Sequence, residues 1–410
     1  MERFPRDIFF NIFSRLPLKS VIQSGYVSKS WLDMIKHPSF AKLYTSRSKP
    51  EPSILILTRR SIGEKKVISI TPVGHKGIQL VADEISVDNM ISSLSWGLVG
   101  TCNGLLCFAS DETVTMVCNP VTRQHVTLPE PTIVESGGSY SPMLAFGFDR
   151  VTNKYKVVRV LYRKSSTTEA GEEFVRAEVY TLGTNSWREV QGFNHHHPRG
   201  KPVYANGVVY WLTSPLNGLD DRILSFDLGN EQFKLIPHRR YGSEISLTEL
   251  GGLLSVVDLS SRDFIQIWVL KDATNIHWEL EYNNPIRKSR WIDRDHPRLV
   301  CVHELRNVLV IWLQDVLMSY DRRSFLTRDL KVRGFPTWLD WEICSGYRGS
   351  LVPLENYRVD GENEQRDVVH FVSDTELHSI LLKGGAFGEQ KTDGRCDKIV
   401  ACFQKHGLLL

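Results

Sequence analysis

The chain has 410 residues, of which 41% are hydrophobic and 24% charged, a composition typical of globular domains with room for one small and one large unit. The formal net charge of +3 does not demand a polyanionic partner such as nucleic acid. No apolar stretch approaches the ~18 uncharged residues of a membrane span, and Arg6 and Asp7 interrupt the first apolar run, so we expect no signal peptide. Seven scattered cysteines favour free thiols in a reducing compartment, the nucleus or cytoplasm.

The first segment, "FPRDIFFNIFSRLP" at residues 4–17, predicts a short helix with a broad apolar face. Apolar residues recur at i, i+4 and i+8 from Ile8 to Leu16, and Phe9 and Phe13 lie beside them. A proline stands at each end, which bounds the helix. Few polar residues remain to keep this helix in water, so another surface must cover it.

Two more helices are expected in the same small domain. One covers 18–24, and the other covers 28–37, with Ser28 as its N-cap and Pro38 ending it. Residues 1–45 are therefore predicted to form a small all-α domain of three short helices. A unit of this size has a marginal core of its own.

A polar stretch with two prolines, residues 46–53, is expected to be a linker. Such a linker indicates a separate helical module, so we expect another protein, rather than the rest of this chain, to cover its apolar face.

Beyond the linker, short apolar runs rich in β-branched and aromatic residues predict strands. The runs come in pairs separated by turn residues, and a weaker seventh pair lies in "VVHFVSD" with "LHSILL" at 368–382. The six clear pairs are "ILILT" with "KVISI", "GLLCFAS" with "VTMVCNP", "KYKVVRVLY" with "AEVYTL", "GVVYWLT" with "ILSFDL", "GLLSVVDL" with "FIQIWVL", and "NVLVIWL" with "VLMSYD".

The pairs repeat along the chain. The second run of several pairs ends at a polar residue, and an equivalent is expected near Lys271; these residues are Asn119, Thr181, Asp227 and Asp321. A strand repeat of roughly 45–50 residues predicts a kelch-like β-propeller of six or seven blades over residues 54–405. A generic all-β domain with coincidental spacing is the alternative.

Four stretches contain residue types that are found in chemical sites. "HHHP" at 195–198 lacks the ligand spacing of a metal site and is expected to be a loop. "CNGLLC" at 102–107 has no second cysteine pair, so its thiols are expected to point into a blade. "KGGAFGEQK" at 383–391 lacks the Gly-Lys-Ser/Thr ending of a phosphate loop. "RKSRWIDRDHPR" at 287–298 mixes acidic with basic residues and is expected to be an exposed loop. We therefore expect no catalytic residue, no metal site and no cofactor.

Any binding function of a propeller is expected to reside in loops between blades. The candidates are residues 135–142, 163–173, 214–221 and 287–298, and no single substrate-binding residue can be named from them.

The first forty residues resemble the F-box of plant F-box proteins. The matching elements are Pro5 and Asp7, the helical isoleucines, "RLPLKS" at 15–20, "VSKSW" at 27–31 and "HPSF" at 37–40. The remainder resembles the kelch-like F-box-associated domain, and the resemblance fades over 340–410. The matching phrases there are "CNGLLCF" (102–108), "NPVTRQHVTLP" (119–129), "FGFDRVTNKYKVVRV" (146–160), "VYTLGTNSWREV" (179–190) and "NGVVYWL" (206–212).

The resemblance implies a non-catalytic substrate receptor of a Skp–cullin–F-box (SCF) ubiquitin ligase. The F-box would dock on a Skp-type adaptor, which connects to the cullin and RING subunits, and the propeller would hold an unidentified target protein; neither nucleic acid nor a membrane is implied. We expect Leu32 and Ile35 to pack inside the F-box. The residues expected to contact the adaptor are Pro5, Ile8, Ile12, Leu16, Pro17, Val27 and Trp31.

A second class of function stays open. The same pattern fits a β-propeller that binds a small molecule or glycan, or acts as a scaffold, outside any ligase. Target turnover and co-assembly with a cullin distinguish the two classes.

Overall fold

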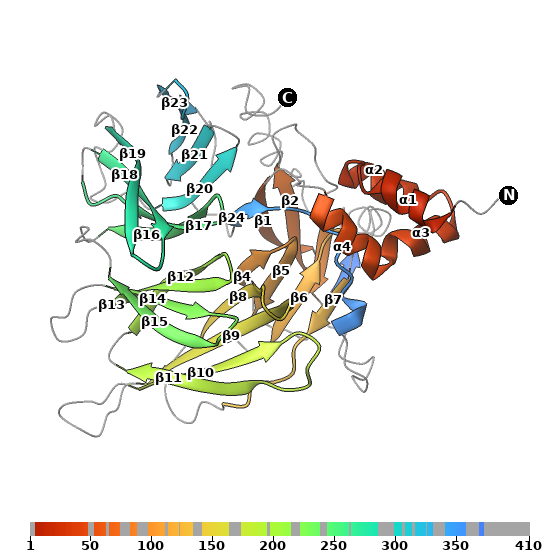
Figure 1. The fold of residues 1–410 in the computed structure, drawn as a ribbon, viewed down its shortest axis with the longest axis horizontal. Helices are drawn as coiled ribbons and strands as arrows, with labels where there is room; N and C mark the ends of the chain where they lie inside the picture. The colour runs from red at the N-terminus through yellow and green to blue at the C-terminus, as the bar shows by residue number, and fades with distance from the viewer. Residues whose placement is uncertain are drawn as a thin grey trace.

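The structure is a computed structural model, and Figure 1 shows its fold. It describes residues 5–47, 53–62, 65–73, 83–87, 97–110, 114–122, 124–133, 142–163, 174–194, 197–214, 222–237, 244–261, 264–285, 299–305, 308–313, 316–324, 326–330, 341–357 and 369–372.

Four short helices open the chain, one more than the three expected. Pro38 ends the third helix, as expected, but does not end the helical region. It opens the fourth helix, because proline fits the first helical position, where its missing N–H needs no partner. The backbone N–H groups of Phe40 and Ala41 donate to the carbonyl of His37 at 2.9 and 3.1 Å. The helices are α1 (Arg6–Phe13), α2 (Leu18–Gly25), α3 (Lys29–Lys36) and α4 (Pro38–Arg47).

The four helices share one core, which we call the helical-domain core. The rings of Phe9 and Phe13 stack at 3.8 Å between centroids, and the Trp31 ring meets Phe13 edge-on at 4.9 Å. The Tyr44 hydroxyl donates to the carbonyl of Leu16 at 3.1 Å, which ties α4 to the end of α1. The buried helical members are Phe9, Phe13, Leu18, Val21, Ile35, Phe40, Ala41 and Tyr44.

The rest of the described chain forms six antiparallel sheets. The first contains β1 (Ser53–Ile62), β2 (Lys65–Val73), β3 (Asp83–Val87), β24 (Trp341–Tyr347) and β25 (Val369–Val372). The second contains β4 (Gly97–Cys102), β5 (Leu105–Ala109), β6 (Thr115–Asn119) and β7 (Gln124–Thr127), and the third β8 (Met143–Asp149), β9 (Lys154–Arg163), β10 (Phe174–Thr181) and β11 (Arg188–Asn194). The fourth contains β12 (His197–Ala205), β13 (Val208–Ser214), β14 (Arg222–Asp227) and β15 (Gln232–Pro237). The fifth contains β16 (Ile245–Leu250), β17 (Leu253–Asp258), β18 (Phe264–Asp272) and β19 (His277–Pro285), and the sixth β20 (Leu299–Leu305), β21 (Val308–Leu313), β22 (Val316–Asp321) and β23 (Leu326–Leu330).

All six clear strand pairs expected from the sequence are antiparallel pairs, and each lies in a different sheet. They are β1–β2, β5–β6, β9–β10, β13–β14, β17–β18 and β21–β22. The weaker seventh pair gives a different result. Its first run contains β25, which pairs with β3 in the first sheet, and its second run lies outside the described residues.

The repeated polar residues cap turns with their side chains, except at Thr181, where the backbone carbonyl accepts hydrogen bonds from the Thr184 N–H and hydroxyl at 3.0 and 2.7 Å. The Oδ1 atoms of Asn119, Asp227, Asp272 and Asp321 each accept hydrogen bonds from the backbone N–H groups two and three residues further on, at 2.8–3.4 Å. The equivalent expected near Lys271 is thus Asp272. A side chain that satisfies two turn N–H groups explains why Asn or Asp recurs at this place in the repeat.

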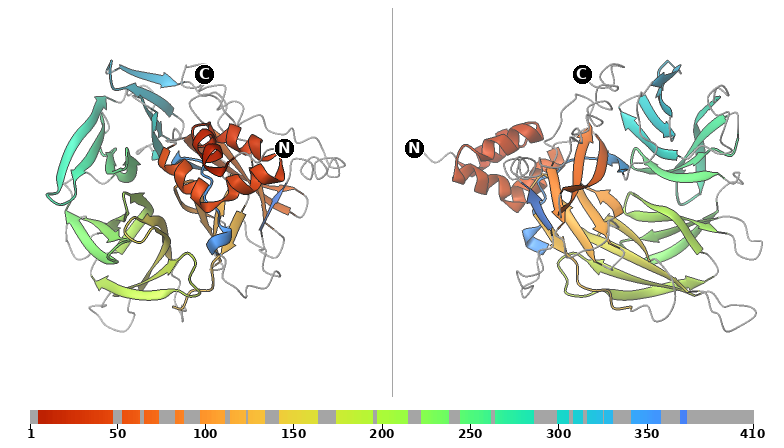
Figure 2. Two further views of the ribbon diagram at one scale, coloured as in Figure 1. Left: turned by 45° about the vertical axis from the view of Figure 1, so that its right-hand side comes forward. Right: turned by 180° about the vertical axis from the view of Figure 1, so that it is seen from behind.

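The sheets close into a ring. The strands β4, β8, β12, β16, β20 and β24 contact one another in this order, and β24 also contacts β4. The first sheet joins strands from both ends of the described chain, since β24 pairs with β1. Figure 2 shows the sheets gathered around a common centre, with the helices at one end beside β4–β7. This arrangement is that of a β-propeller.

The helical domain is not a separate module, contrary to the expectation from the linker. Leu351, which follows β24, is 4% exposed and belongs to the helical-domain core, and Val121 from the turn after β6 packs against it. The chain itself therefore covers part of the helical domain.

Candidate functional site

Helix α1 has two apolar faces. Phe9 and Phe13 point into the helical-domain core, whereas Ile8 and Ile12 are 47% and 46% exposed. Because residues four apart lie on the same side of a helix, Ile8 and Ile12 form an adjacent pair on the outer face. The core needs only the inner face, so the outer pair is left for another contact.

The turn between α2 and α3 exposes a second apolar pair. Tyr26 is 84% exposed and Val27 is 67% exposed. Ser28 caps α3 as expected, since its hydroxyl oxygen accepts a hydrogen bond from the Trp31 backbone N–H at 3.2 Å. The cap fixes the backbone just after Tyr26 and Val27 and thereby holds both side chains at the surface.

Tyr26 was not among the expected contact residues. Its position between two short helices, next to Val27, is the sequence signal that points to it. Leu32 also differs from expectation: it is 38% exposed rather than packed inside, whereas Ile35 is buried as expected.

The structure places the seven expected adaptor-contact residues in two groups. Leu16 and Trp31 are half-buried and pack against the helical-domain core, where they support the fold. The other five, all exposed, are Pro5, Ile8, Ile12, Pro17 and Val27. We call these five residues, together with the exposed Tyr26 and Leu32, the outer apolar set: Pro5, Ile8, Ile12, Pro17, Tyr26, Val27 and Leu32.

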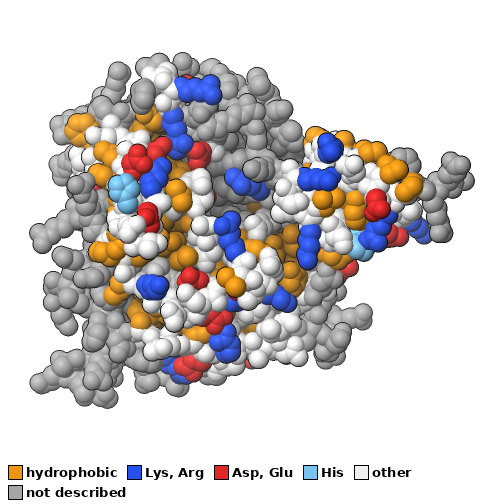
Figure 3. Space-filling model, in the orientation of Figure 1, with side chains coloured by type: hydrophobic (Ala, Val, Ile, Leu, Met, Phe, Trp, Pro, Cys, Tyr) orange, Lys and Arg blue, Asp and Glu red, His pale blue; other side chains and the backbone are white. Residues whose placement is uncertain are grey.

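Positive charge accompanies the outer apolar set. Residues 5–47 contain seven Lys and Arg side chains against two Asp, in a chain whose net charge is +3. Figure 3 shows Lys and Arg side chains next to hydrophobic ones on the helical domain. A partner for this domain therefore needs an apolar surface bordered by negative charge.

The cysteines of "CNGLLC" lie in the sheets, as expected. Cys102 and Cys107 are buried free thiols on β4 and β5, and Cys118 on β6 is another. Burial raises the pKa of Cys102 to about 12 and raises the pKa of Cys107 and Cys118 as well. A protonated, buried thiol is neither a nucleophile nor a metal ligand.

Most other stretches weighed as sites fall outside the described residues. His195, His196 and residues 383–391 lie there, as do 287–298 and nearly all of the other candidate target-binding loops. His197 and Pro198, expected in a loop, instead begin β12 and pair with β13. In the part that is described, no three His, Cys, Asp or Glu side chains stand together as metal ligands would. None of the described helices has the length and hydropathy of a membrane-spanning segment.

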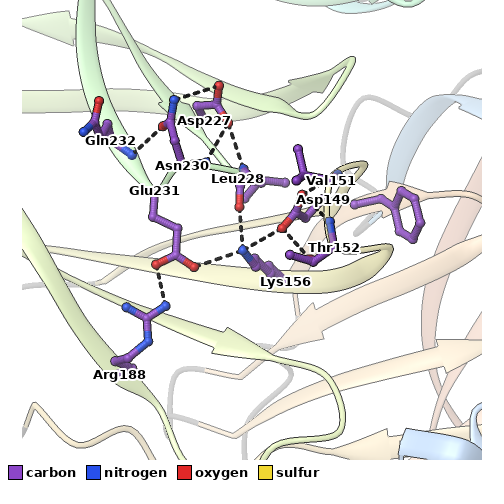
Figure 4. A network of polar contacts seen from close by, with 12 residues as sticks. Asp149, Val151, Thr152, Lys156, Arg188, Asp227, Leu228, Asn230, Glu231 and Gln232 are labelled. Atoms are coloured by element: carbon purple, nitrogen blue, oxygen red, sulfur yellow. Dashed lines mark hydrogen bonds and ion pairs between the residues drawn. The ribbon is translucent and has the colours of Figure 1, made fainter.

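Figure 4 shows a cluster of charged side chains that lies between two sheets. The Lys156 ammonium lies 2.8 Å from Asp149 Oδ2 and donates to Glu231 Oε1 at 2.9 Å and to the Leu228 carbonyl at 2.5 Å. Arg188 also donates to Glu231. Each charge has an opposite charge beside it, and the contacts join the third sheet to the turn between β14 and β15. The cluster therefore cross-links two sheets and offers no free acid or base.

This cluster predicts a fall in stability in acid. Burial alone would raise the pKa of Asp149 and Glu231, but hydrogen bonds outweigh it and lower both values, mainly bonds from Lys156 and Thr152 to Asp149 and from Arg188 and Lys156 to Glu231. Their contribution to stability is complete above their unfolded pKa near 4 and is lost as the pH falls through the lower folded pKa.

We expect the free energy of unfolding to fall below about pH 5, and Asp149→Asn to flatten that fall. Urea unfolding at a series of pH values measures it. Asp33→Asn, at an exposed site on α3, is the matched control and should leave the slope unchanged. An unchanged slope in Asp149→Asn would contradict the assignment.

Two family models match the chain. Residues 1–43 match the F-box domain, and residues 55–317 match the F-box associated beta propeller domain. The two matches correspond to the four helices and to the larger part of the ring of sheets.

Similar proteins align with this chain over most of their length. F-box protein At3g07870 from Arabidopsis thaliana is 26% identical over 387 residues, covering 84% of this chain and 91% of the relative. F-box protein At5g49610 from the same plant is 24% identical over 369 residues, covering 85% and 97%. Among solved structures, an oligogalacturonate lyase in complex with manganese superposes with a TM-score of 0.42 at 9% identity, covering 71% of this chain and 89% of the lyase. At that score the likeness carries no conclusion about this chain.

Proposed function

Because the chain belongs to the F-box proteins with an F-box associated β-propeller domain, we propose that it is the substrate-recognition subunit of an SCF ubiquitin ligase. The F-box binds a Skp-type adaptor and through it the cullin and RING subunits. The ring of sheets binds a target protein and holds it near the ubiquitin-loaded enzyme. The chain then acts by proximity and orientation and contributes no catalytic group.

The outer apolar set carries this proposal. The helical-domain core is already filled by Phe9, Phe13 and their neighbours, yet Ile8, Ile12, Tyr26 and Val27 remain exposed. Burying an apolar side chain of this size is worth about 1.5–3 kcal/mol, so exposing several on a domain of four short helices favours a partner that covers them. Within the described residues, the buried, protonated thiols and the paired charges of the Figure 4 cluster fit a receptor that acts by binding.

We further propose six blades, each one sheet, and residence in the nucleus or cytoplasm. Six is supported by the closed contacts among the strands β4, β8, β12, β16, β20 and β24, and by the pairing of β25 with the first sheet. The kelch-like character of the repeat stays a prediction, because the family matched is the F-box associated propeller domain.

Reconstitution tests the function. The chain is co-expressed with a Skp-type adaptor, a cullin and a RING subunit, and the purified mixture is analysed by size-exclusion chromatography with light scattering. One copy of each subunit in a single particle is the expected result. A monomeric chain that ignores the adaptor would refute the proposal and leave a propeller that binds a small molecule or glycan, or a scaffold, as the explanation.

Tyr26→Ser is expected to weaken adaptor binding at least tenfold, because a large exposed aromatic side chain beside Val27 has the character of an interface anchor. The melting temperature should change little, since the side chain is 84% exposed. Isothermal titration with purified adaptor measures the affinity, and Tyr26→Phe should retain it. Equal affinities of the serine variant and the wild type would remove Tyr26 from the contact.

A further inference from the structure

The residues after β24 join the two parts of the molecule. Residues 348–357 leave the first sheet, pass along the second sheet and end in the short 3-10 helix η2 (Glu355–Tyr357). Two leucines three positions apart in this segment are buried in different cores. Leu351 is 4% exposed in the helical-domain core, and Leu354 is fully buried among residues of the second and third sheets.

The segment is bound firmly to the sheets. The Asn119 side-chain amide donates to the carbonyls of Ser350 and Val352 at 3.2 and 2.8 Å. Gln124 accepts from the Leu354 backbone N–H at 2.9 Å through its Oε1 atom. Asn119 therefore has two roles, since its Oδ1 atom caps the turn after β6 while its amide holds the segment.

The backbone of residues 348–357 also packs closely against the second sheet. Gly104 sits in the left-handed region at φ +79°, and a Cβ atom there would lie 2.4 Å from the Arg348 carbonyl oxygen. Only glycine permits that approach. At the other end of the segment, the Tyr357 ring meets the Tyr155 ring edge-on at 6.1 Å between centroids.

Side-chain contacts, as well as the covalent connection, therefore attach the helical domain to the sheets. Leu351 enters its core, and Val121, from the turn that Asn119 caps, packs against the same core. The covalent link is short, because α4 ends at Arg47 and β1 begins at Ser53. The outer isoleucines Ile8 and Ile12 stay exposed despite these contacts.

We propose that residues 348–357 are a strap that fixes the helical domain in one orientation on the ring of sheets, with Leu351 as its positioning residue. The proposal deepens the proposed function and rests on it for its purpose: a receptor that acts by orientation needs a constant geometry between the adaptor and the target. The physical statement, one rigid body instead of two tethered ones, concerns the free chain and is tested on it.

Leu351→Asp tests the strap, because it places a charge in an apolar core. Small-angle scattering of the free full-length chain should show a larger radius of gyration and maximum dimension than the wild type. Hydrogen exchange should become at least tenfold faster in α1–α4, while β9 and β13 keep their protection. Leu351→Met, which conserves volume, should behave as the wild type. Leu235→Asp, at a partly exposed site on β15, controls for the added charge and should also match the wild type.

The outcomes separate the strap from the ligase role. Unchanged dimensions and exchange in Leu351→Asp, or the same expansion in Leu235→Asp, would overturn the strap while leaving adaptor binding by the wild type intact. If the wild type fails to bind the adaptor, the proposed function falls and the scattering result still decides the strap. Should Leu351→Asp not fold, Val121→Ser makes the same test from the turn after β6 and should give a smaller expansion.

A positioning role also requires that the expansion persist in the adaptor-bound Leu351→Asp complex. Adaptor-bound dimensions equal to those of the wild-type complex would reduce Leu351 to ordinary core packing.

Discussion

Glu178→Ala is expected to lower the free energy of unfolding by about 3–5 kcal/mol, the usual cost of leaving one member of a buried ion pair without its partner. Glu178 and Arg159 lie side by side on β10 and β9, both buried, with Arg159 Nη1 2.6 Å from Glu178 Oε1. The second carboxylate oxygen accepts three hydrogen bonds from Thr132 and Ile133. Removing the carboxylate leaves the buried Arg159 guanidinium without a counter-charge. It also leaves the donor groups of Thr132 and Ile133 without their acceptor.

Chemical denaturation of the full chain measures this loss, and the neighbouring strand supplies the control. Glu189 on β11 stands opposite Glu178 in register and pairs with Arg176 through two bonds of 2.8 Å at the surface. Because exposed ion pairs contribute little, Glu189→Ala should cost much less stability than Glu178→Ala. Similar losses in the two variants would contradict the role of burial. The double variant Arg159→Met/Glu178→Leu should recover part of the loss.

The second large effect concerns the outer apolar set. Ile8→Asp combined with Ile12→Asp is expected to reduce adaptor affinity at least 100-fold, because two carboxylates would replace the apolar pair on the outer face of α1 and would have to be desolvated on binding. The helical domain should stay folded, since both side chains are about half exposed and its core consists of other residues.

Titration calorimetry with purified adaptor and far-UV circular dichroism are the paired measurements. Val151→Asp, at a highly exposed position in the turn between β8 and β9, is the matched control and should bind as the wild type. Phe9→Ala separates surface from core: Phe9 is fully buried, so this variant should lose helical structure together with binding. A double aspartate variant that binds within threefold of the wild type would show that the adaptor does not use α1.

Local patterns in the sequence identified most elements correctly. The i, i+4 spacing from Ile8 predicted α1, the hydroxyl of Ser28 predicted the start of α3, and runs of β-branched residues predicted the six strand pairs. The recurring Asn or Asp at strand ends revealed the repeat, because the turn that follows needs such a side chain within three residues. Each of these signals depends on a few neighbouring residues and does not require contacts with the rest of the molecule.

The sequence did not predict features that depend on which of several alternative packing contacts forms in the folded chain. Pro38 ends α3 as expected, but it also opens α4, which was not expected and which buries Phe40 and Tyr44. Leu32 and Ile35 both suit the inner side of α3, yet the core accommodates Ile35 and leaves Leu32 38% exposed. β25 had been assigned to a seventh pair, but the edge of the first sheet was free to accept it.

The sequence by itself determined the domain order, the helical and strand elements, the repeat and, through its family resemblance, the membership of the chain among the F-box proteins. Tertiary structure alone decided which apolar residues stay outside, how the ring closes through β24 and β1, and that Leu351 completes the core of a domain formed by residues 5–47. The physical reason is distance along the chain. Periodicity and capping act between neighbouring residues, whereas the bond from Asn119 to Val352 joins positions 233 residues apart and forms only when the whole ring has brought them together.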